Sequence, residues 1–184
     1  MKIIGLVGRM AAGKGHVANL LSTHYNAQVV TLSDILRQVA AEAGEPNPNR
    51  QYLQDLGDRL RQERGSHVLV QIAIDISVGC DLLVIEGIRN TAEAEYVQLK
   101  FGDILAVTAD REVRFNRMLN RGRSDDPSTW AEFLIMEEKD LHGKHEHGQQ
   151  VASCLELANF TITNNGEEIS IHQELESYLK GKEL

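Results

Sequence analysis

The sequence predicts an α/β fold, with about five parallel strands and helices on both faces of the sheet. Short apolar runs rich in β-branched residues alternate with segments whose apolar residues recur at helical spacing, an order typical of parallel sheets. The first apolar run ends in a glycine-rich turn that opens a helix. A length of 184 residues, with 42% hydrophobic and 25% charged residues, favours one globular domain over residues 1–184.

The strands are expected where apolar runs are short and bounded by turn residues, at 2–7, 29–32, 81–86, 104–108 and 160–163. Helices are expected between them because apolar residues there recur three and four positions apart.

One pair of expected helices interrupts this alternation. The first begins with Ser33 or Asp34 as its N-cap and stops before Gly44, and the second ends near Gly65. A largely apolar helix over 68–78 follows. We expect residues 33–65 to form a helical flap.

Composition excludes several classes of protein. A net charge of −8 argues against binding to nucleic acid or to an anionic membrane. Cys80 and Cys154 are isolated, so neither a zinc site nor a disulfide framework is expected. The sequence contains neither a signal-peptide pattern nor a run of about 18 apolar residues, so a cytoplasmic protein is expected.

The strongest motif is the P-loop pattern G-x-x-x-x-G-K, which follows a predicted strand and opens a predicted helix. Small residues let the backbone N–H groups turn inward around phosphate, and the helix N-terminus adds partial positive charge. Lys14 is expected to reach the β- and γ-phosphates of ATP. The predicted phosphate-binding residues are Gly8, Ala11, Ala12, Gly13, Lys14, Gly15 and His16.

Gly15 stands where most P-loops carry the Ser or Thr that binds Mg²⁺. The Gly-Lys-Gly form resembles adenylate kinases, although His16 replaces the threonine that usually follows. Residues 33–37 (Ser-Asp-Ile-Leu-Arg) resemble the segment of these kinases whose arginine binds the acceptor nucleotide. The resemblance implies an acceptor site at Asp34 and Arg37; an N-cap with an exposed ion pair is the alternative.

Residues 84–89 (Val-Ile-Glu-Gly-Ile-Arg) resemble the D-G-F-P-R segment of the same kinases, with Glu in place of Asp. By this resemblance Arg89 is the second arginine on the acceptor phosphate. Glu86 is expected near Mg²⁺, which it would contact through water. The alternative is a glutamate that caps a neighbouring helix.

Arginines cluster in residues 111–123, where Arg114, Arg117 and Arg121 share a predicted helix face. Such a cluster suits phosphoryl transfer, which spreads negative charge over the migrating group. The segment resembles the kinase helix in which Arg117 would pack on adenine and Arg121 would contact phosphate. Arg123 resembles the arginine of the later R-x-D-D segment. We expect a short lid over 121–148; a solvated basic face is the alternative.

Residues 157–166 resemble a segment near the end of dephospho-coenzyme A kinases, which would place Asn164 to Gly166 beside the ATP base. A plain Asn-Gly turn fits the same residues. His142, His145 and His147 lack a zinc spacing and are expected in a polar loop.

Together these segments resemble the nucleoside monophosphate kinase group, which implies a three-layer P-loop kinase fold, ATP and Mg²⁺ as cofactors, and a small nucleotide as acceptor. Lys14, Asp34, Arg121 and Arg123 are the expected catalytic residues. Two alternatives stay open: a dephospho-coenzyme A kinase, in which Asp34 is the base, and a non-catalytic ATP-binding sensor or adaptor.

Overall fold

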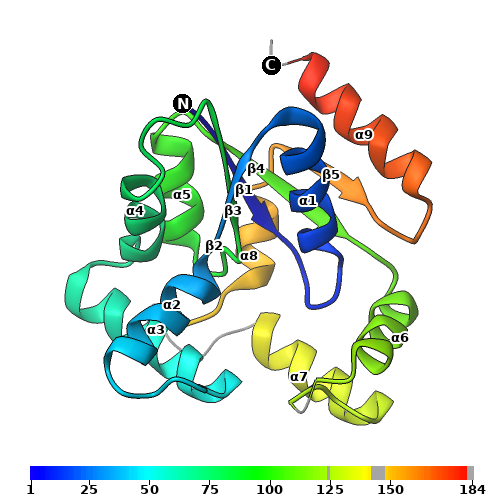
Figure 1. Ribbon diagram of the computed structural model, residues 1–184. Helices are drawn as coiled ribbons and strands as arrows, with labels where there is room; N and C mark the ends of the chain where they lie inside the picture. Colours follow the sequence, from blue (N-terminus) through cyan, green and yellow to red (C-terminus); the bar gives the residue numbers. More distant parts are fainter. Residues whose placement is uncertain (124, 142–147, 182–184) are drawn as a thin grey trace.

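The computed structural model describes residues 1–123, 125–141 and 148–181. In this part of the chain five parallel strands form one sheet in the order β2-β3-β1-β4-β5 (Figure 1). The strands are β1 (Lys2–Val7), β2 (Gln28–Thr31), β3 (Leu82–Glu86), β4 (Asp103–Thr108) and β5 (Phe160–Thr163). The predicted α/β fold with a parallel sheet is confirmed.

Helices cover both faces of this sheet (Figure 1). One face carries α1 (Lys14–Tyr25) and α9 (Glu168–Lys180). The other carries α2 (Leu32–Glu42), α3 (Arg50–Arg64), α4 (Val68–Asp75), α5 (Thr91–Leu99) and α8 (Val151–Glu156). The remaining described helices, α6 (Arg111–Arg121) and α7 (Trp130–Leu141), lie beyond the edge where the strands end.

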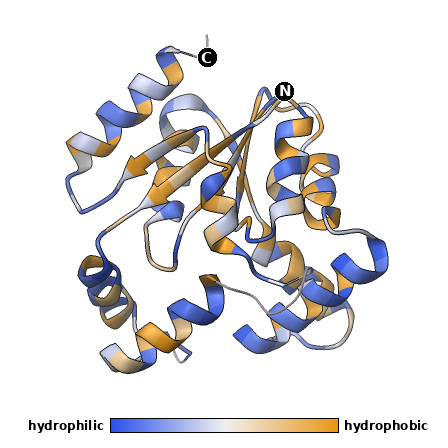
Figure 2. Cartoon of the chain, turned by 180° about the vertical axis from the view of Figure 1, so that it is seen from behind, coloured by the Kyte–Doolittle hydropathy of each residue, from blue (hydrophilic) through white to orange (hydrophobic). Residues whose placement is uncertain are grey.

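The central strand shows why the sheet needs cover on both sides. Ile3 and Val7 point into the core beneath α2 to α5, and Ile4 and Leu6 point into the core beneath α1 and α9. All four are at most 5% exposed. Strands buried on both faces are apolar throughout, which is the pattern Figure 2 shows in orange.

Helix starts near the acceptor flap differ from the expectation. The helix predicted to start from a Ser33 or Asp34 cap begins at Leu32, after Thr31, and no side-chain cap is formed. The start shifts because Leu32 is buried at 2% exposure, so core packing rather than capping sets it. The apolar helix expected to reach residue 78 ends at Asp75.

A third small apolar cluster fixes α6 and α7 to the phosphate loop. Met10 of the loop packs with Met118 of α6 and Phe133 of α7, and all three are buried. The loop, α6 and α7 therefore meet at the carboxyl edge of the sheet, where β1 and β3 also end.

Candidate active site

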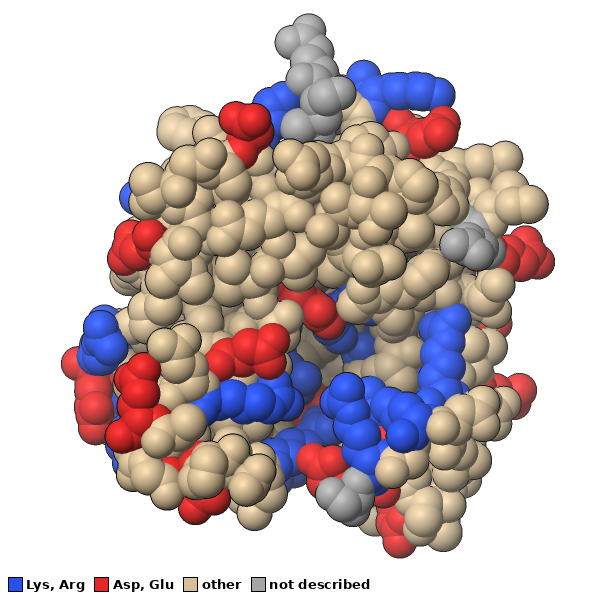
Figure 3. All heavy atoms as spheres, viewed as in Figure 1, with Lys and Arg blue, Asp and Glu red and all other residues tan. Residues whose placement is uncertain are grey.

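A cavity of about 650 Å³ opens at the carboxyl edge of the sheet. Figure 3 shows Lys and Arg side chains gathered around a hollow in the lower half of this face. The lining comes from the phosphate loop, from α2 and α3, from the end of β3, and from α6 and the segment after it. Its charged members are Lys14, Asp34, Arg37, Arg50, Arg61, Glu86, Arg89, Arg117, Arg121, Arg123, Asp125 and Asp126.

The phosphate loop has the backbone that its glycines permit. Gly13 has φ +94°, and a Cβ there would overlap Asn164 Nδ2. Gly8 passes so close to the Val107 carbonyl oxygen of β4 that a Cβ would overlap it. Ala11 also adopts a positive φ of 55°. These positions let the loop turn tightly into α1 against the end of β4.

Lys14 is folded over the loop, where its Nζ donates hydrogen bonds to the carbonyl oxygens of Gly8 (2.9 Å) and Arg9 (3.1 Å). The pKa of Lys14 is lowered to about 8, mainly by burial and then by nearby Arg89, while Glu86 and Asp140 partly oppose the shift. An anionic ligand between the loop and these arginines would restore the charged form. Lys14 therefore lines the cavity with its Nζ on the loop carbonyls, and its contact with phosphate stays a prediction.

The carboxylate of Glu86 faces the first turn of α1. A Cβ placed at Gly15 would lie 3.7 and 3.8 Å from its two oxygens, so the carboxylate occupies the side of the loop where other P-loops carry a hydroxyl. Glu86 is paired in register with Leu6 of β1 and Thr31 of β2, which fixes its place at the end of β3.

Glu86 could bind Mg²⁺ only together with ligands that do not come from the protein. Carboxylate oxygen is a ligand that Mg²⁺ accepts, and the ion usually keeps several waters. No group of three or more His, Cys, Asp or Glu side chains in the described part of the chain could hold a metal alone. A magnesium ion at Glu86 would therefore also need phosphate oxygens and water.

Asp34 and Arg37 form the exposed ion pair that was the simpler alternative. Arg37 Nη1 lies 2.7 Å from Asp34 Oδ1 and also donates to Ser33 Oγ at 3.0 Å. The two paired side chains are 49% and 71% exposed, so solvent screens the interaction. Both residues nevertheless line the cavity, which leaves their predicted role at the acceptor open.

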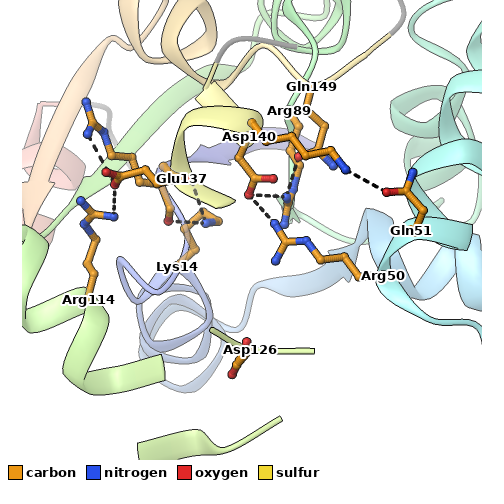
Figure 4. Close-up of polar contacts among 12 residues, drawn as sticks. Lys14, Arg50, Gln51, Arg89, Arg114, Asp126, Glu137, Asp140 and Gln149 are labelled. Carbon is orange, nitrogen blue, oxygen red and sulfur yellow. Dashed lines mark hydrogen bonds and ion pairs between the residues drawn. The ribbon is translucent and has the colours of Figure 1, made fainter. Parts of the chain in front are cut away.

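Arg89 has a different carboxylate partner, which comes from α7. Its Nη1 lies 3.4 Å from Asp140 Oδ2 and donates to Gln149 Oε1 at 2.9 Å. Arg50, the first residue of α3, donates to the same Asp140 oxygen at 2.5 Å (Figure 4). The structure therefore brings Arg89 together with Arg50, while Arg37 pairs elsewhere.

Neither Arg50 nor Asp140 was singled out from the sequence. One signal was available for Arg50, since a basic residue in the first turn of a helix opposes the helix dipole and calls for an acidic partner. That turn contains no acidic residue. Asp140 gave no signal, because a charged residue near the end of an amphipathic helix is usually exposed.

The arginines of α6 and of the segment after it lie in different environments. Arg114 is 2% exposed and its Nη1 lies 2.5 Å from Glu137 Oε1, so it does not line the main cavity. It therefore does not share a ligand-facing side of α6 with Arg117 and Arg121, as the sequence predicted, because a buried carboxylate on α7 holds it. Arg121 makes two hydrogen bonds of 2.6 Å to Asp126. Arg123 is exposed and lines the cavity.

Arg117 lies against the phosphate loop. Its guanidinium donates to Asn164 Oδ1 at 2.7 Å and to the carbonyl oxygens of Ala11 (3.4 Å) and Ala12 (3.3 Å). Burial lowers the pKa of Arg117 from its usual value. The arrangement joins α6, the loop and the segment after β5, which are the three parts expected to surround ATP.

The other predicted residues have plainer surroundings. His16 is exposed at the start of α1 and lines the cavity, whereas Gly166, with φ +112°, follows Asn164 in the loop after β5 without lining it. His142, His145 and His147 lie outside the described residues, as do parts of the expected lid region. No helix in the described ranges is long and apolar enough to cross a membrane.

Comparison with known proteins finds relatives over nearly the whole chain. A family model described as an AAA domain matches residues 4–140. A UPF0200 protein of Pyrococcus horikoshii is 33% identical over 171 residues, covering 89% of this chain and 88% of the relative. A UPF0200 protein of Methanoregula boonei is 31% identical over 170 residues, covering 90% and 89%.

Solved structures agree in fold at low sequence identity. Shikimate kinase from Bacteroides thetaiotaomicron superposes with a TM-score of 0.61 at 12% identity, covering 100% of this chain and 99% of that one. Shikimate kinase from Aquifex aeolicus gives 0.58 at 15% identity, covering 97% and 96%. The predicted P-loop kinase fold is confirmed.

Proposed function

We propose that this chain, which belongs to the UPF0200 family and carries an AAA domain, is an ATP-dependent phosphotransferase acting on a nucleoside monophosphate or a similar nucleotide. The carrying observation is that one cavity joins the phosphate loop and Lys14 to a second set of arginines on the helical flap and after β3. Two anionic ligands could meet end to end in such a cavity.

The roles follow from where the side chains lie. Backbone N–H groups of residues 8–16 would bind the ATP phosphates, with Lys14 at the β- and γ-phosphates. Arg121 and Arg123 would neutralise the migrating group. Mg²⁺, held in part by Glu86, would shield charge between the phosphates. Arg117 and the 164–166 loop would flank the base.

In the proposed step an oxygen of the acceptor phosphate forms a bond to the γ-phosphorus, and the bond from that phosphorus to the β,γ-bridging oxygen breaks. The products are ADP and a nucleoside diphosphate. An anionic acceptor oxygen needs no base, so Asp34 would position Arg37 in this reaction. Residues 33–65 would serve as the acceptor flap and residues 121–148 as the lid.

A second candidate is phosphorylation of a hydroxyl group, as in dephospho-coenzyme A kinase. The observation that favours it is Asp34, an exposed carboxylate in the cavity lining that could accept the hydroxyl proton. Asp34→Asn separates the two candidates. It should abolish transfer to a hydroxyl and only reduce transfer to a phosphate.

The test is ADP formation from ATP and Mg²⁺ with a panel of nucleoside monophosphates, dephospho-coenzyme A and shikimate, the acceptor named for the fold neighbours. Lys14→Ala should lower kcat at least 100-fold with the active acceptor, because it removes a charge that faces the transferred phosphate. Arg59→Ala, an exposed change on α3 outside the cavity, is the control. Tight ATP binding without turnover of any acceptor would favour the sensor or adaptor role instead.

A further inference from the structure

We propose that Arg50 and Arg89 together bind the anionic group of the acceptor, and that Asp140 on α7 positions both arginines. The inference rests on the proposed function, since it names the acceptor end of the same cavity. It identifies the acceptor as a phosphate monoester, and it makes α7 part of the acceptor site.

The geometry of the three side chains is the first support. Arg50 enters from the first turn of α3 and Arg89 from the loop after β3, and Asp140 Oδ2 lies 2.5 Å from the former and 3.4 Å from the latter (Figure 4). The two arginines come from the flap and from the sheet. One carboxylate oxygen thus fixes the distance between two parts of the cavity wall.

Burial makes this contact persistent. The Asp140 side chain is 6% exposed, and its Oδ1 has no hydrogen-bond partner in the described part of the chain. A carboxylate this buried is costly unless cations stay beside it, so both arginines are held in place. By contrast, the Asp34–Arg37 pair is exposed, and each of its members is free to rearrange at little cost.

The arginines keep donors available for a ligand. A guanidinium has five N–H donors, and the contacts described for Arg50 use Nη2 while those for Arg89 use Nη1. Both side chains line the cavity. Two guanidiniums and one carboxylate leave one net positive charge there, which suits a phosphate dianion and leaves a neutral acceptor without a partner.

The rest of this end of the cavity suits a flat or apolar body attached to the phosphate. Leu36 of α2, Leu53 of α3 and Leu69 of α4 all contribute to the lining. Gln54 adds an amide that can donate and accept hydrogen bonds. A phosphate monoester with a ring system, such as a nucleoside monophosphate, matches both the arginine pair and this lining.

Contact between α3 and α7 extends one residue beyond the arginine. Lys139 Nζ, next to Asp140, donates to Gln51 Oε1, next to Arg50, at 2.8 Å. Two adjacent pairs therefore join the N-terminus of the flap helix to the end of α7. A change at Asp140 should reach the acceptor through Arg50 without altering the backbone of the phosphate loop.

Binding of acceptor without ATP tests this directly in calorimetry, with AMP, CMP, GMP and UMP as phosphate-monoester probes and dephospho-coenzyme A, whose phosphates form a pyrophosphate diester, as the contrasting probe that should bind less tightly. Arg50→Ala should weaken the tightest probe about 10- to 100-fold, the loss of a hydrogen bond to a charged group. Affinity for ATP should stay within about twofold. The same nucleoside without its phosphate should bind wild type and variant equally.

Asp140 is tested as a positioning residue. At pH 7, where Lys14 is mostly charged, Asp140→Asn should raise KM for the acceptor about tenfold with kcat and ATP affinity little changed, and Asp140→Glu should restore part of the loss. A general loss of structure would instead change both substrates together. Arg50→Lys, which keeps the charge but not the planar fork, should fall between wild type and Arg50→Ala.

A control variant and separate outcomes distinguish failure of the acceptor site from failure of the kinase function. Arg59→Ala lies on the same helix outside the cavity and should match wild type. Equal acceptor binding by Arg50→Ala and Arg59→Ala would overturn the assignment, as would a wild-type protein that binds none of the probes. Binding that depends on Arg50 without any turnover would support the site while overturning the kinase function.

Discussion

Binding of ATP should take up protons at alkaline pH, because Lys14 is only partly charged in the free protein. Its pKa is lowered to about 8, first by burial and then by Arg89. At pH 8 about half of the molecules therefore carry a neutral Lys14, and at pH 7 about a tenth do. Phosphates placed beside Nζ would raise the pKa again, so we expect uptake of about 0.5 proton per ATP at pH 8.

The sign follows from linkage. The protonated form binds ATP, so affinity should fall as pH rises through 8, and the dissociation constant should approach a tenfold increase per pH unit above about 9. In the absence of ATP the unfolded chain holds the Lys14 proton between pH 8 and 10.5, so this group makes the free energy of unfolding rise with pH over that window.

Calorimetry in buffers of different ionisation enthalpy measures the uptake. Lys14→Arg is the matched control, because arginine stays charged throughout this range and the protons of ATP itself cancel in the difference. Wild type should exceed the variant by about 0.5 proton at pH 8 and by about 0.1 at pH 7. Equal uptake by the two proteins at pH 8 would refute a titrating Lys14 at the phosphates.

Two further predictions concern the carboxylates of Glu86 and Glu93. Gly15→Ser fits, since its Cβ would lie 3.7 Å from Glu86, and a hydroxyl there should tighten binding of ATP with Mg²⁺ about fivefold while leaving binding with chelator unchanged; an unchanged magnesium effect would argue against a metal at Glu86. Glu93→Gln removes a fully buried partner of Arg61, with Asp58 remaining, and should lower the free energy of unfolding by about 3 kcal/mol in urea titrations. A loss below about 1 kcal/mol would mean that the pair is replaceable.

Local sequence patterns were sufficient for the sheet and the phosphate loop. Strands buried on both faces must be apolar throughout, so each run marked its strand to within one residue. The P-loop was equally clear because its backbone requires small residues at fixed offsets from Lys14. The start of α2 at Leu32 was missed because burial of that leucine outweighs the capping preference of the residues after it.

The ion-pair partners of the arginines could not be predicted from local sequence patterns. Arg114 and Arg121 share a helix face in the sequence, yet one is buried against Glu137 and the other is held by Asp126. Which arginine faces a ligand depends on where α7 docks, and that is set by packing of Phe133 against the loop and α6. Periodicity identifies the face of a helix but not the helix that covers it.

The charge distribution connects these findings. The chain carries a net charge of −8, yet the cavity lining contains eight Lys or Arg residues and four Asp or Glu residues in the described part of the chain. Positive charge is therefore concentrated where the strands end and the phosphate loop begins, with acidic surface elsewhere. Such focusing attracts small anions to one site and strengthens each contact there as water is excluded. It also explains why the buried Asp140 of α7 accompanies Arg50 and Arg89, since without this carboxylate the two cavity arginines would repel each other before any ligand arrived.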